Sequence, residues 1–258
     1  MKTSSSKSVT HQKVALVTGG SRGIGAATCL QLAKAGYAVI INYAASQAIT
    51  DKLCESIALA GGTALGLQAD VADEAQVLAM FAAIDAKFGR LDALVNNAGV
   101  VDMTARLDAM SVARWKRMFD INVIGSLICA REAVKRMSTR YGHSGGAIVN
   151  LSSAAARLGS PGQYLDYAAS KGAIDTFTLG LAKEVAAEGI RVNGVRPGII
   201  DTDIHASGGL PNRVAQIAPL VPMQRGGSAD EVASAIVWLL SDAASYVTGT
   251  TIDVTGGR

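Results

Sequence analysis

The regular alternation of short apolar runs with longer helical patterns restricts the fold of this 258-residue chain more than any other feature. The first run, Val14-Ala15-Leu16-Val17, is continuous, as in a strand buried on both faces. Further strands are predicted over 38–42, 64–69, 91–95, 147–151, 190–195 and 251–254, and helices over 26–36, 46–60, 73–88 and 229–240. Strands that alternate with helices predict a parallel sheet covered on both faces. We therefore expect a single α/β domain with a Rossmann-like, doubly wound, seven-stranded sheet.

Composition and charge exclude several classes of function. The chain has 24 basic and 21 acidic side chains, a net charge of +3, and 5% scattered aromatic residues, which is unlike a nucleic-acid-binding face. Cys29, Cys54 and Cys129 show no metal-ligand spacing and indicate a reducing compartment. Residues 1–12 are rich in Ser, Thr and Lys and lack the apolar run of a signal peptide or membrane span. We expect a flexible tail over 1–12, no membrane contact, no bound metal and a cytoplasmic location.

A glycine-rich stretch follows the first strand. It reads Thr18-Gly19-Gly20-Ser21-Arg22-Gly23-Ile24-Gly25 and leads into a helical pattern. Glycines allow the backbone to approach a pyrophosphate, and a helix N-terminus offers unpaired N–H groups to it. The stretch predicts a dinucleotide cradle, although glycine turns between strand and helix also occur without a ligand.

Polar residues follow the other predicted strands at the same edge of the sheet. Asp70-Val71 comes after the third strand, and Asn96-Asn97-Ala98-Gly99 after the fourth. Ligands of open parallel sheets bind at the carboxyl ends of the strands. Asp70 can accept a hydrogen bond from an adenine amine and Asn96 can fix loop geometry, or either residue can be an ordinary loop cap.

Tyr167 and Lys171 are four residues apart on a predicted helix, so both side chains lie on one face. Lowering a tyrosine pKa from ~10 to ~7 requires ~4 kcal/mol. An ammonium ~4 Å away at an effective dielectric of ~20 supplies about that much. The pair predicts an acid/base, although the same spacing also arises by chance on amphipathic helices. Ser152 and Ser153 close the preceding strand, at the same edge of the sheet.

The segment 112–140 is too long for one plain helix, and it carries Asn122 among apolar neighbours. A buried amide costs free energy unless it is hydrogen-bonded. Asn122 therefore either satisfies a nearby backbone group or distorts the helix and holds a water, and Gly125 favours a distortion.

These motifs together resemble the short-chain dehydrogenase/reductase family in residue identity and in order. They are Thr18-Gly19-x-x-x-Gly23-x-Gly25, Asn96-Asn97-Ala98-Gly99, Asn122, Ser153, Tyr167-x-x-x-Lys171 and Pro197-Gly198. The resemblance covers residues 13–258, the expected catalytic domain, and is strongest to 3-oxoacyl-carrier-protein-reductase-like and glucose-dehydrogenase-like members. It implies reversible NAD(P)-dependent interconversion of a carbonyl (ketone, 3-oxoacyl or sugar type) and an alcohol, by a homotetramer.

The resemblance also implies roles for individual residues. Tyr167 would be the acid/base, Lys171 would lower its pKa and bind the nicotinamide ribose, and Ser153 would hold the substrate oxygen. Asn122 would anchor a water in a proton relay. With Tyr167 and Lys171, the expected cofactor-binding positions are Gly19, Ser21, Arg22, Gly23, Ile24, Gly25, Asn42, Tyr43, Ser46, Asp70, Val71, Asn97, Ala98, Gly99, Pro197, Gly198, Ile200 and Thr202.

The end of the second strand bears on the choice of cofactor. An acid there binds the adenosine ribose and favours NAD, but this strand ends in Asn42-Tyr43. Arg22, with Ser46 nearby, could instead bind a 2′-phosphate. We therefore expect NADP(H) to be preferred, with NAD(H) possible, unless Arg22 is only a surface charge. An NAD-dependent alcohol or sugar dehydrogenase and a non-catalytic dinucleotide sensor are the alternatives.

The sequence does not name the substrate. The segment 199–227 is predicted to be a substrate-binding loop or lid. It contains Ile204, His205, Leu210 and Met223, and no single charged residue in it requires an oppositely charged partner. The spacing from Ser153 to Tyr167 is one residue longer than in most relatives, and the extra residue falls within Gln163-Tyr164-Leu165-Asp166. This insertion is expected to alter the rim of the pocket.

Overall fold

The computed structural model describes residues 12–202 and 208–258, so the expected tail, apart from Gln12, and Ile204 and His205 lie outside the described residues. The strands are β1 (Val14–Val17), β2 (Ala38–Tyr43), β3 (Thr63–Gln68), β4 (Ala93–Asn96), β5 (Gly146–Leu151), β6 (Ile190–Pro197) and β7 (Thr251–Val254). The helices are α1 (Gly23–Lys34), α2 (Gln47–Leu59), α3 (Glu74–Phe88), α4 (Val112–Phe119), α5 (Gly125–Met137), α6 (Ala155–Leu158), α7 (Leu165–Val185), α9 (Arg213–Ile217) and α10 (Ala229–Leu240). Short 3-10 turns lie at 107–109, 139–141, 186–188, 218–220 and 242–244.

The seven strands form one sheet in the order β3-β2-β1-β4-β5-β6-β7, and every neighbouring pair is parallel. The order reverses between β1 and β4, which is the crevice where ligands bind in such sheets. The predicted single Rossmann-like domain is confirmed.

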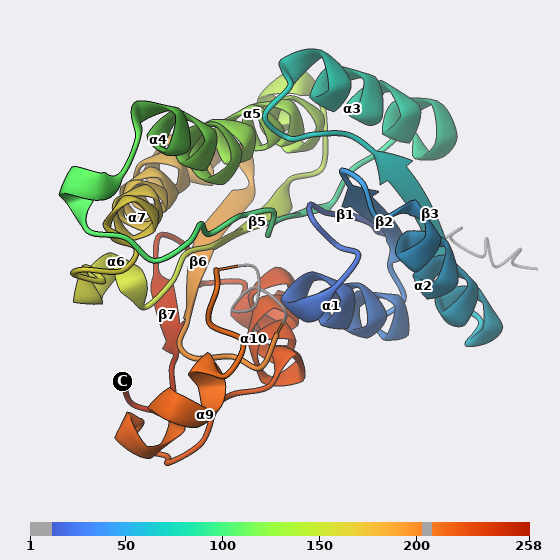
Figure 1. Ribbon diagram of the computed structural model, residues 1–258. Helices are drawn as coiled ribbons and strands as arrows, with labels where there is room; N and C mark the ends of the chain where they lie inside the picture. Colours follow the sequence, from blue (N-terminus) through green and yellow to red (C-terminus); the bar gives the residue numbers. More distant parts are fainter. Residues whose placement is uncertain (1–11, 203–207) are drawn as a thin grey trace, which may run out of the picture.

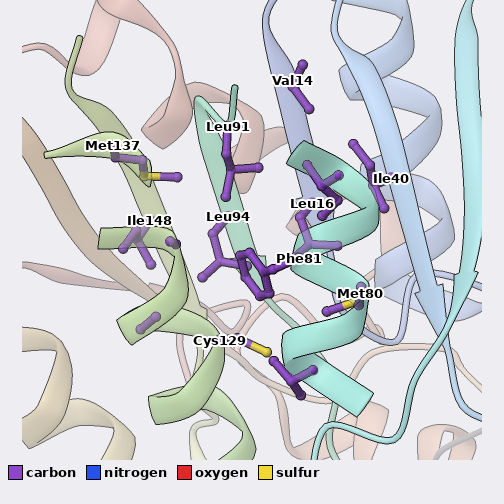
Figure 2. Close-up of a cluster of buried hydrophobic side chains, with 14 of the residues drawn as sticks. Val14, Leu16, Ile40, Met80, Phe81, Leu91, Leu94, Cys129, Met137 and Ile148 are labelled. Carbon is purple, nitrogen blue, oxygen red and sulfur yellow. The ribbon is translucent and has the colours of Figure 1, made fainter. Parts of the chain in front are cut away.

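Helices cover both faces of the sheet (Figure 1). On one face α3, α5 and α7 pack against alternate strand residues such as Leu16 and Leu94, with the side chain of Phe81 fully buried among them (Figure 2). On the other face α1, α2 and α10 pack against the intervening strand residues, including Val17 and Val95. Strands buried on both faces read as continuous apolar runs, and this is why short runs of four residues predicted them.

Side chains that cap helices set several of the observed boundaries. Asp73 accepts a hydrogen bond from the Gln76 N–H and starts α3, and Ser228 forms a capping box with Glu231 that starts α10. Gly89, with φ +64°, ends α3 in the left-handed conformation. No helix among residues 12–202 and 208–258 is long and apolar enough to cross a membrane.

The segment 112–140 is interrupted, as its length predicted. A π-helical turn, Asp120–Ile124, separates α4 from α5 and contains the buried Asn122. Such turns insert an extra residue into a helix and are frequent at functional sites. The loop 199–227 is less irregular than expected, since it carries α9 and a 3-10 turn, Ala218–Leu220.

Candidate active site

The glycine-rich stretch forms a tight loop between β1 and α1. Gly19 and Gly23 have φ values of +59° and +53°, which side chains other than glycine rarely adopt. A Cβ atom on Gly25 would lie 2.5 Å from the Gly19 carbonyl oxygen, so only glycine lets the helix pack so closely on the loop. Arg22 occupies the N-cap position and its side chain does not cap α1, which leaves the N–H groups of the first turn for an anion. This cradle fits a pyrophosphate.

Two side chains from the ends of β1 and β4 lock the loop in place. Asn97 donates through Nδ2 to the carbonyl oxygens of Thr18 (2.8 Å) and Gly19 (3.0 Å). The Thr18 hydroxyl accepts from the N–H groups of Asn97 and Ala98, each at 3.0 Å. Asn96, in contrast, is buried and donates to the Ser126 carbonyl and the Asn150 amide oxygen. Asn97 rather than Asn96 therefore fixes this loop.

The side chain of Asn42 supports the backbone of the glycine-rich loop. Its Oδ1 accepts from the Gly19 N–H at 3.2 Å, and its Nδ2 donates to the Ala69 carbonyl at 2.9 Å and to the Leu67 carbonyl at 3.4 Å. The side chain is buried and its amide is engaged within the protein. The Asn42 side chain thus supports the backbone of the cradle at Gly19. Tyr43, which follows it, is also buried.

Arg22 and Ser46 meet at the outer edge of the cradle. Nη2 of Arg22 donates to the Ser46 hydroxyl at 2.6 Å, although 24 residues separate them. Arg22 is exposed, while Ser21 beside it is buried. The two groups expected to recognise a 2′-phosphate therefore lie together at the end of β2.

Asp70 and Val71 lie at the end of β3. Asp70 is exposed, and its Oδ1 accepts from the Ala72 N–H at 3.0 Å, so it caps its own loop. Val71 is buried and packs against Gly125, where a Cβ atom would come within 2.8 Å of it. The loop-cap alternative describes Asp70 in this structure.

Ser153, Tyr167 and Lys171 line one cavity of about 470 Å³ at the carboxyl edge of the sheet. Ile24, Asn97, Gly99, Pro197, Gly198, Ile200 and Thr202, all expected at the cofactor site, line the same cavity. The Lys171 ammonium lies 5.7 Å from the centre of the Tyr167 ring and donates to the Leu151 carbonyl oxygen at 2.7 Å. Ser153 accepts from the Ala155 N–H at 3.1 Å, while Ser152 is buried and donates to the Lys171 carbonyl.

Burial dominates the protonation of this cluster. It raises the pKa of Tyr167 above its ordinary value, and a hydrogen bond with Ser153 lowers that pKa by less. Burial also lowers the pKa of Lys171 from 10.5 to about 8, against a smaller opposing effect of Asp175. The Lys171 ammonium donates one hydrogen bond to the Leu151 carbonyl and lies on the same face of α7 as Tyr167.

Asn122 joins the π-helical turn to the loop after β4. Its Oδ1 accepts from the Val100 N–H at 2.8 Å, and its Nδ2 donates to the Val100 carbonyl at 3.0 Å and to the Ser170 hydroxyl at 3.2 Å. The Asn122 amide therefore satisfies a backbone group, as the first of the two alternatives predicted, and it lies within the π-helical turn. A Cβ on Gly99 would lie 3.4 Å from Asn122 Oδ1 and 3.5 Å from Lys171 Nζ, which places the amide beside the cavity.

Arg213 is among the cavity residues that sequence reasoning missed, as is Arg258. Arg213 begins α9 within the loop 199–227, lines the cavity, and holds its guanidinium 5.1 Å from the centre of the Tyr164 ring. The sequence carries little signal for this, because 46 residues separate Arg213 from Tyr167 and only the loop brings them to one cavity.

A dinucleotide cradle beside a Tyr–Lys–Ser cluster, on a doubly wound sheet, defines the class of nicotinamide-dependent α/β oxidoreductases. Comparison with known proteins narrows this class. Residues 19–258 match the family model described as "Enoyl-(Acyl carrier protein) reductase". The chain is 59% identical over 245 residues to the uncharacterized oxidoreductase YgfF of Escherichia coli (strain K12), covering 95% of this chain and 99% of that one.

Two further similarities agree. The chain is 40% identical over 246 residues to the 3-oxoacyl-[acyl-carrier-protein] reductase of Synechocystis sp., covering 95% of this chain and 96% of that one. A solved mutant of a short-chain dehydrogenase/reductase from Serratia marcescens superposes with a TM-score of 0.88 at 34% identity, covering 96% of this chain and 98% of that one. The chain belongs to the short-chain dehydrogenase/reductase family. It is an oxidoreductase that acts on CH–OH groups of a small-molecule substrate and uses a nicotinamide dinucleotide.

Proposed function

We propose that this enzyme transfers hydride between NADP(H) and a carbonyl or secondary alcohol, with Tyr167 as the acid/base. The observation that supports it most is the convergence of Ser153, Tyr167 and Lys171 on one cavity that the cofactor-loop residues also line. The three side chains come from the end of β5 and from α7. A bound nicotinamide supplies the hydride in reduction and accepts it in oxidation.

Tyr167 moves the proton at the substrate oxygen. In reduction its hydroxyl donates to the carbonyl oxygen as negative charge develops there, and Ser153 donates a second hydrogen bond to the same atom. The raised pKa keeps the phenol protonated at neutral pH, which suits the acid role.

Lys171 and Asn122 support Tyr167. With a pKa of about 8, the Lys171 ammonium is mostly charged at pH 7, and its positive charge stabilises the phenolate that forms when the proton is transferred. We assign it also to the nicotinamide ribose, as in the family. Asn122 holds the loop at Val100 and the Ser170 hydroxyl, and we assign it the anchoring of a relay water.

The cofactor we propose is NADP(H), with NAD(H) used less well. Arg22 and Ser46 offer a guanidinium and a hydroxyl together at the end of β2, and neither of the last two residues of that strand is acidic. A 2′-phosphate bound by Arg22 gains a charge-assisted contact of roughly 1.5–3 kcal/mol, equivalent to about a ten- to hundredfold preference.

We further propose a homotetramer located in the cytoplasm. The layer formed by α4, the π-helical turn and α7 carries exposed apolar side chains, among them Phe119, Ile124 and Leu179. We propose that these side chains form part of a subunit contact, since large exposed apolar patches mark protein–protein contacts. A second contact is proposed at β7, which is one of the two edge strands of the sheet. A light-scattering mass near 26.5 kDa at micromolar concentration would contradict the tetramer.

The function is tested with purified protein, NADPH or NADH, and a panel of ketones, acyl thioesters, quinones and aldoses. We expect oxidation of NADPH with at least one carbonyl class, and a higher kcat/KM with NADPH than with NADH. Quenching of protein fluorescence by NADPH without turnover of any carbonyl would favour the dinucleotide sensor. Equal or better kcat/KM with NADH would favour the NAD-dependent dehydrogenase.

A further inference from the structure

The substrate cavity has an unbalanced charge. Lys171, Arg213 and Arg258 line it, and among the described residues no aspartate or glutamate does. Lys171 is engaged with the Leu151 carbonyl, and Arg258 is exposed at the rim. Arg213 is half-buried and forms no ion pair with any described residue, whereas the exposed Arg225 of the same loop is paired with Glu231. Neither Arg213 nor Arg258 is in an ion pair with a described residue, and Arg213 is the less exposed of these two guanidinium groups.

The inserted segment before Tyr167 positions this guanidinium. Tyr164 is buried at the N-cap of α7, its hydroxyl donates to the Gly208 carbonyl at 3.0 Å, and its ring lies 5.1 Å from the Arg213 guanidinium carbon. An arginine that rests on an aromatic ring keeps its planar edge in a fixed orientation, and that edge matches a carboxylate. The same tyrosine thus joins the catalytic helix to the loop that carries Arg213.

We propose that Arg213 binds a carboxylate at the end of the substrate remote from the reacting carbonyl, so that this enzyme acts on small keto acids and hydroxy acids. The proposal rests on the proposed function for the reacting end. A cavity of about 470 Å³ is at the lower end of ligand sites and is shared with the nicotinamide, so the remaining space suits a small molecule. A single guanidinium held against Tyr164 suits a monoanion such as a carboxylate, which one planar fork binds bidentately.

The test compares each acid with its methyl ester in a series of increasing length: 3-oxobutanoate, 4-oxopentanoate and 5-oxohexanoate. We expect the wild type to prefer the acid of at least one length by roughly tenfold to a hundredfold in kcat/KM. Arg213→Gln should bring that ratio to about one, and Arg213→Lys should retain part of it. Arg106→Gln, which removes an exposed charge paired with Asp108, is the matched control and should leave the ratio unchanged.

A binding measurement separates this proposal from the proposed function. Calorimetric titration of the same acids and esters into protein saturated with NADP⁺ reports affinity without turnover. Preference for the acid that Arg213→Gln removes supports the carboxylate subsite even if no ketone is reduced. Equal binding and turnover of acid and ester at every length, or an unchanged preference in Arg213→Gln, would overturn it. Activity confined to acetoacetyl-CoA would overturn it as well.

Discussion

The carboxylate of Asp166 accepts two hydrogen bonds from the guanidinium of Arg114, 2.7 Å from Nε and 3.1 Å from Nη2. Both side chains are largely buried, with 10% of Arg114 and 2% of Asp166 exposed. Asp166 also accepts from the Tyr167 N–H at 3.0 Å. The pair therefore fixes the first turn of α7, where Tyr167 lies, against α4.

Removing Arg114 should destabilise the protein strongly. Arg114→Met leaves the Asp166 carboxylate buried and unpaired, so we expect a loss of about 3–5 kcal/mol in the free energy of unfolding. Urea denaturation measures it. Arg114→Met/Asp166→Leu should recover most of the loss, and Arg106→Gln, at an exposed pair, should cost at most about 1 kcal/mol. A loss of similar size at both arginines would show that burial of the Arg114 pair does not matter.

Local patterns predicted the strands and most helices because the central strands are buried on both faces and several helix starts carry their own caps. Asp73, Ser228 and Glu231 act within four residues, so the chain itself displays them. The bounds of β3 and β4 differed by one or two residues from expectation, since hydrogen bonding to neighbouring strands sets strand ends.

The features of the candidate site that the sequence did not predict depend on contacts between distant segments of the chain. The hydrogen bonds of the Asn42 side chain join it to Gly19 and Ala69, which are 23 and 27 residues away in the sequence, and local patterns do not show them. The hydrogen bond from the Lys171 ammonium to the Leu151 carbonyl at the end of β5 also joins residues 20 apart and was not predicted. The sequence spacing of two side chains predicts that they share one helix face. The hydrogen-bond partners that a neighbouring strand offers then determine their orientation.

Tyr167→Phe should lower turnover by orders of magnitude and leave cofactor affinity nearly intact. The substitution removes only the hydroxyl that transfers the proton, an interaction made in the transition state. Steady-state kinetics on any active carbonyl and NADPH titration by fluorescence measure the two effects. Retention of more than a tenth of the activity would remove Tyr167 from its proposed role.

Lys171 should make stability depend on pH in the alkaline range. Its pKa is about 8 in the folded protein and 10.5 ordinarily, so between these values the unfolded chain binds the extra proton. Stability of the wild type should therefore rise with pH across this window, relative to Lys171→Met, by up to about 3 kcal/mol. Below about pH 7 the difference should be constant, with the buried charge destabilising the wild type. Urea denaturation at several pH values without cofactor measures the free energy of unfolding of both proteins. The prediction would be contradicted if the two free energies changed in parallel from pH 7 to 10.5.

Gly25→Ala should damage the cofactor cradle. The new Cβ would lie 2.5 Å from the Gly19 carbonyl oxygen and 2.6 Å from Asn97 Nδ2, so the loop or the helix must move. We expect NADPH affinity to fall at least tenfold, because the N–H groups of α1 no longer face the pyrophosphate. Gly36→Ala, at a turn where a Cβ meets nothing within 4 Å, is the control for backbone strain alone and should leave affinity unchanged. An equal effect of both substitutions would indicate general destabilisation.

Arg22 should decide the preference between the two cofactors. Arg22→Ala removes the guanidinium beside Ser46, and we expect kcat/KM with NADPH to fall about ten- to hundredfold while the value with NADH changes little. Asn42→Asp is a poor route to reversal, because the buried amide donates to the Leu67 and Ala69 carbonyls and a carboxylate there would lose both bonds. We expect that variant to be less stable, with a weakened cradle for both cofactors. Arg157→Ala, an exposed arginine paired with Asp253 and outside the cradle, controls for net charge. A fall of equal size with NADH and NADPH in Arg22→Ala would mean that Arg22 holds the pyrophosphate or the loop rather than the 2′-phosphate.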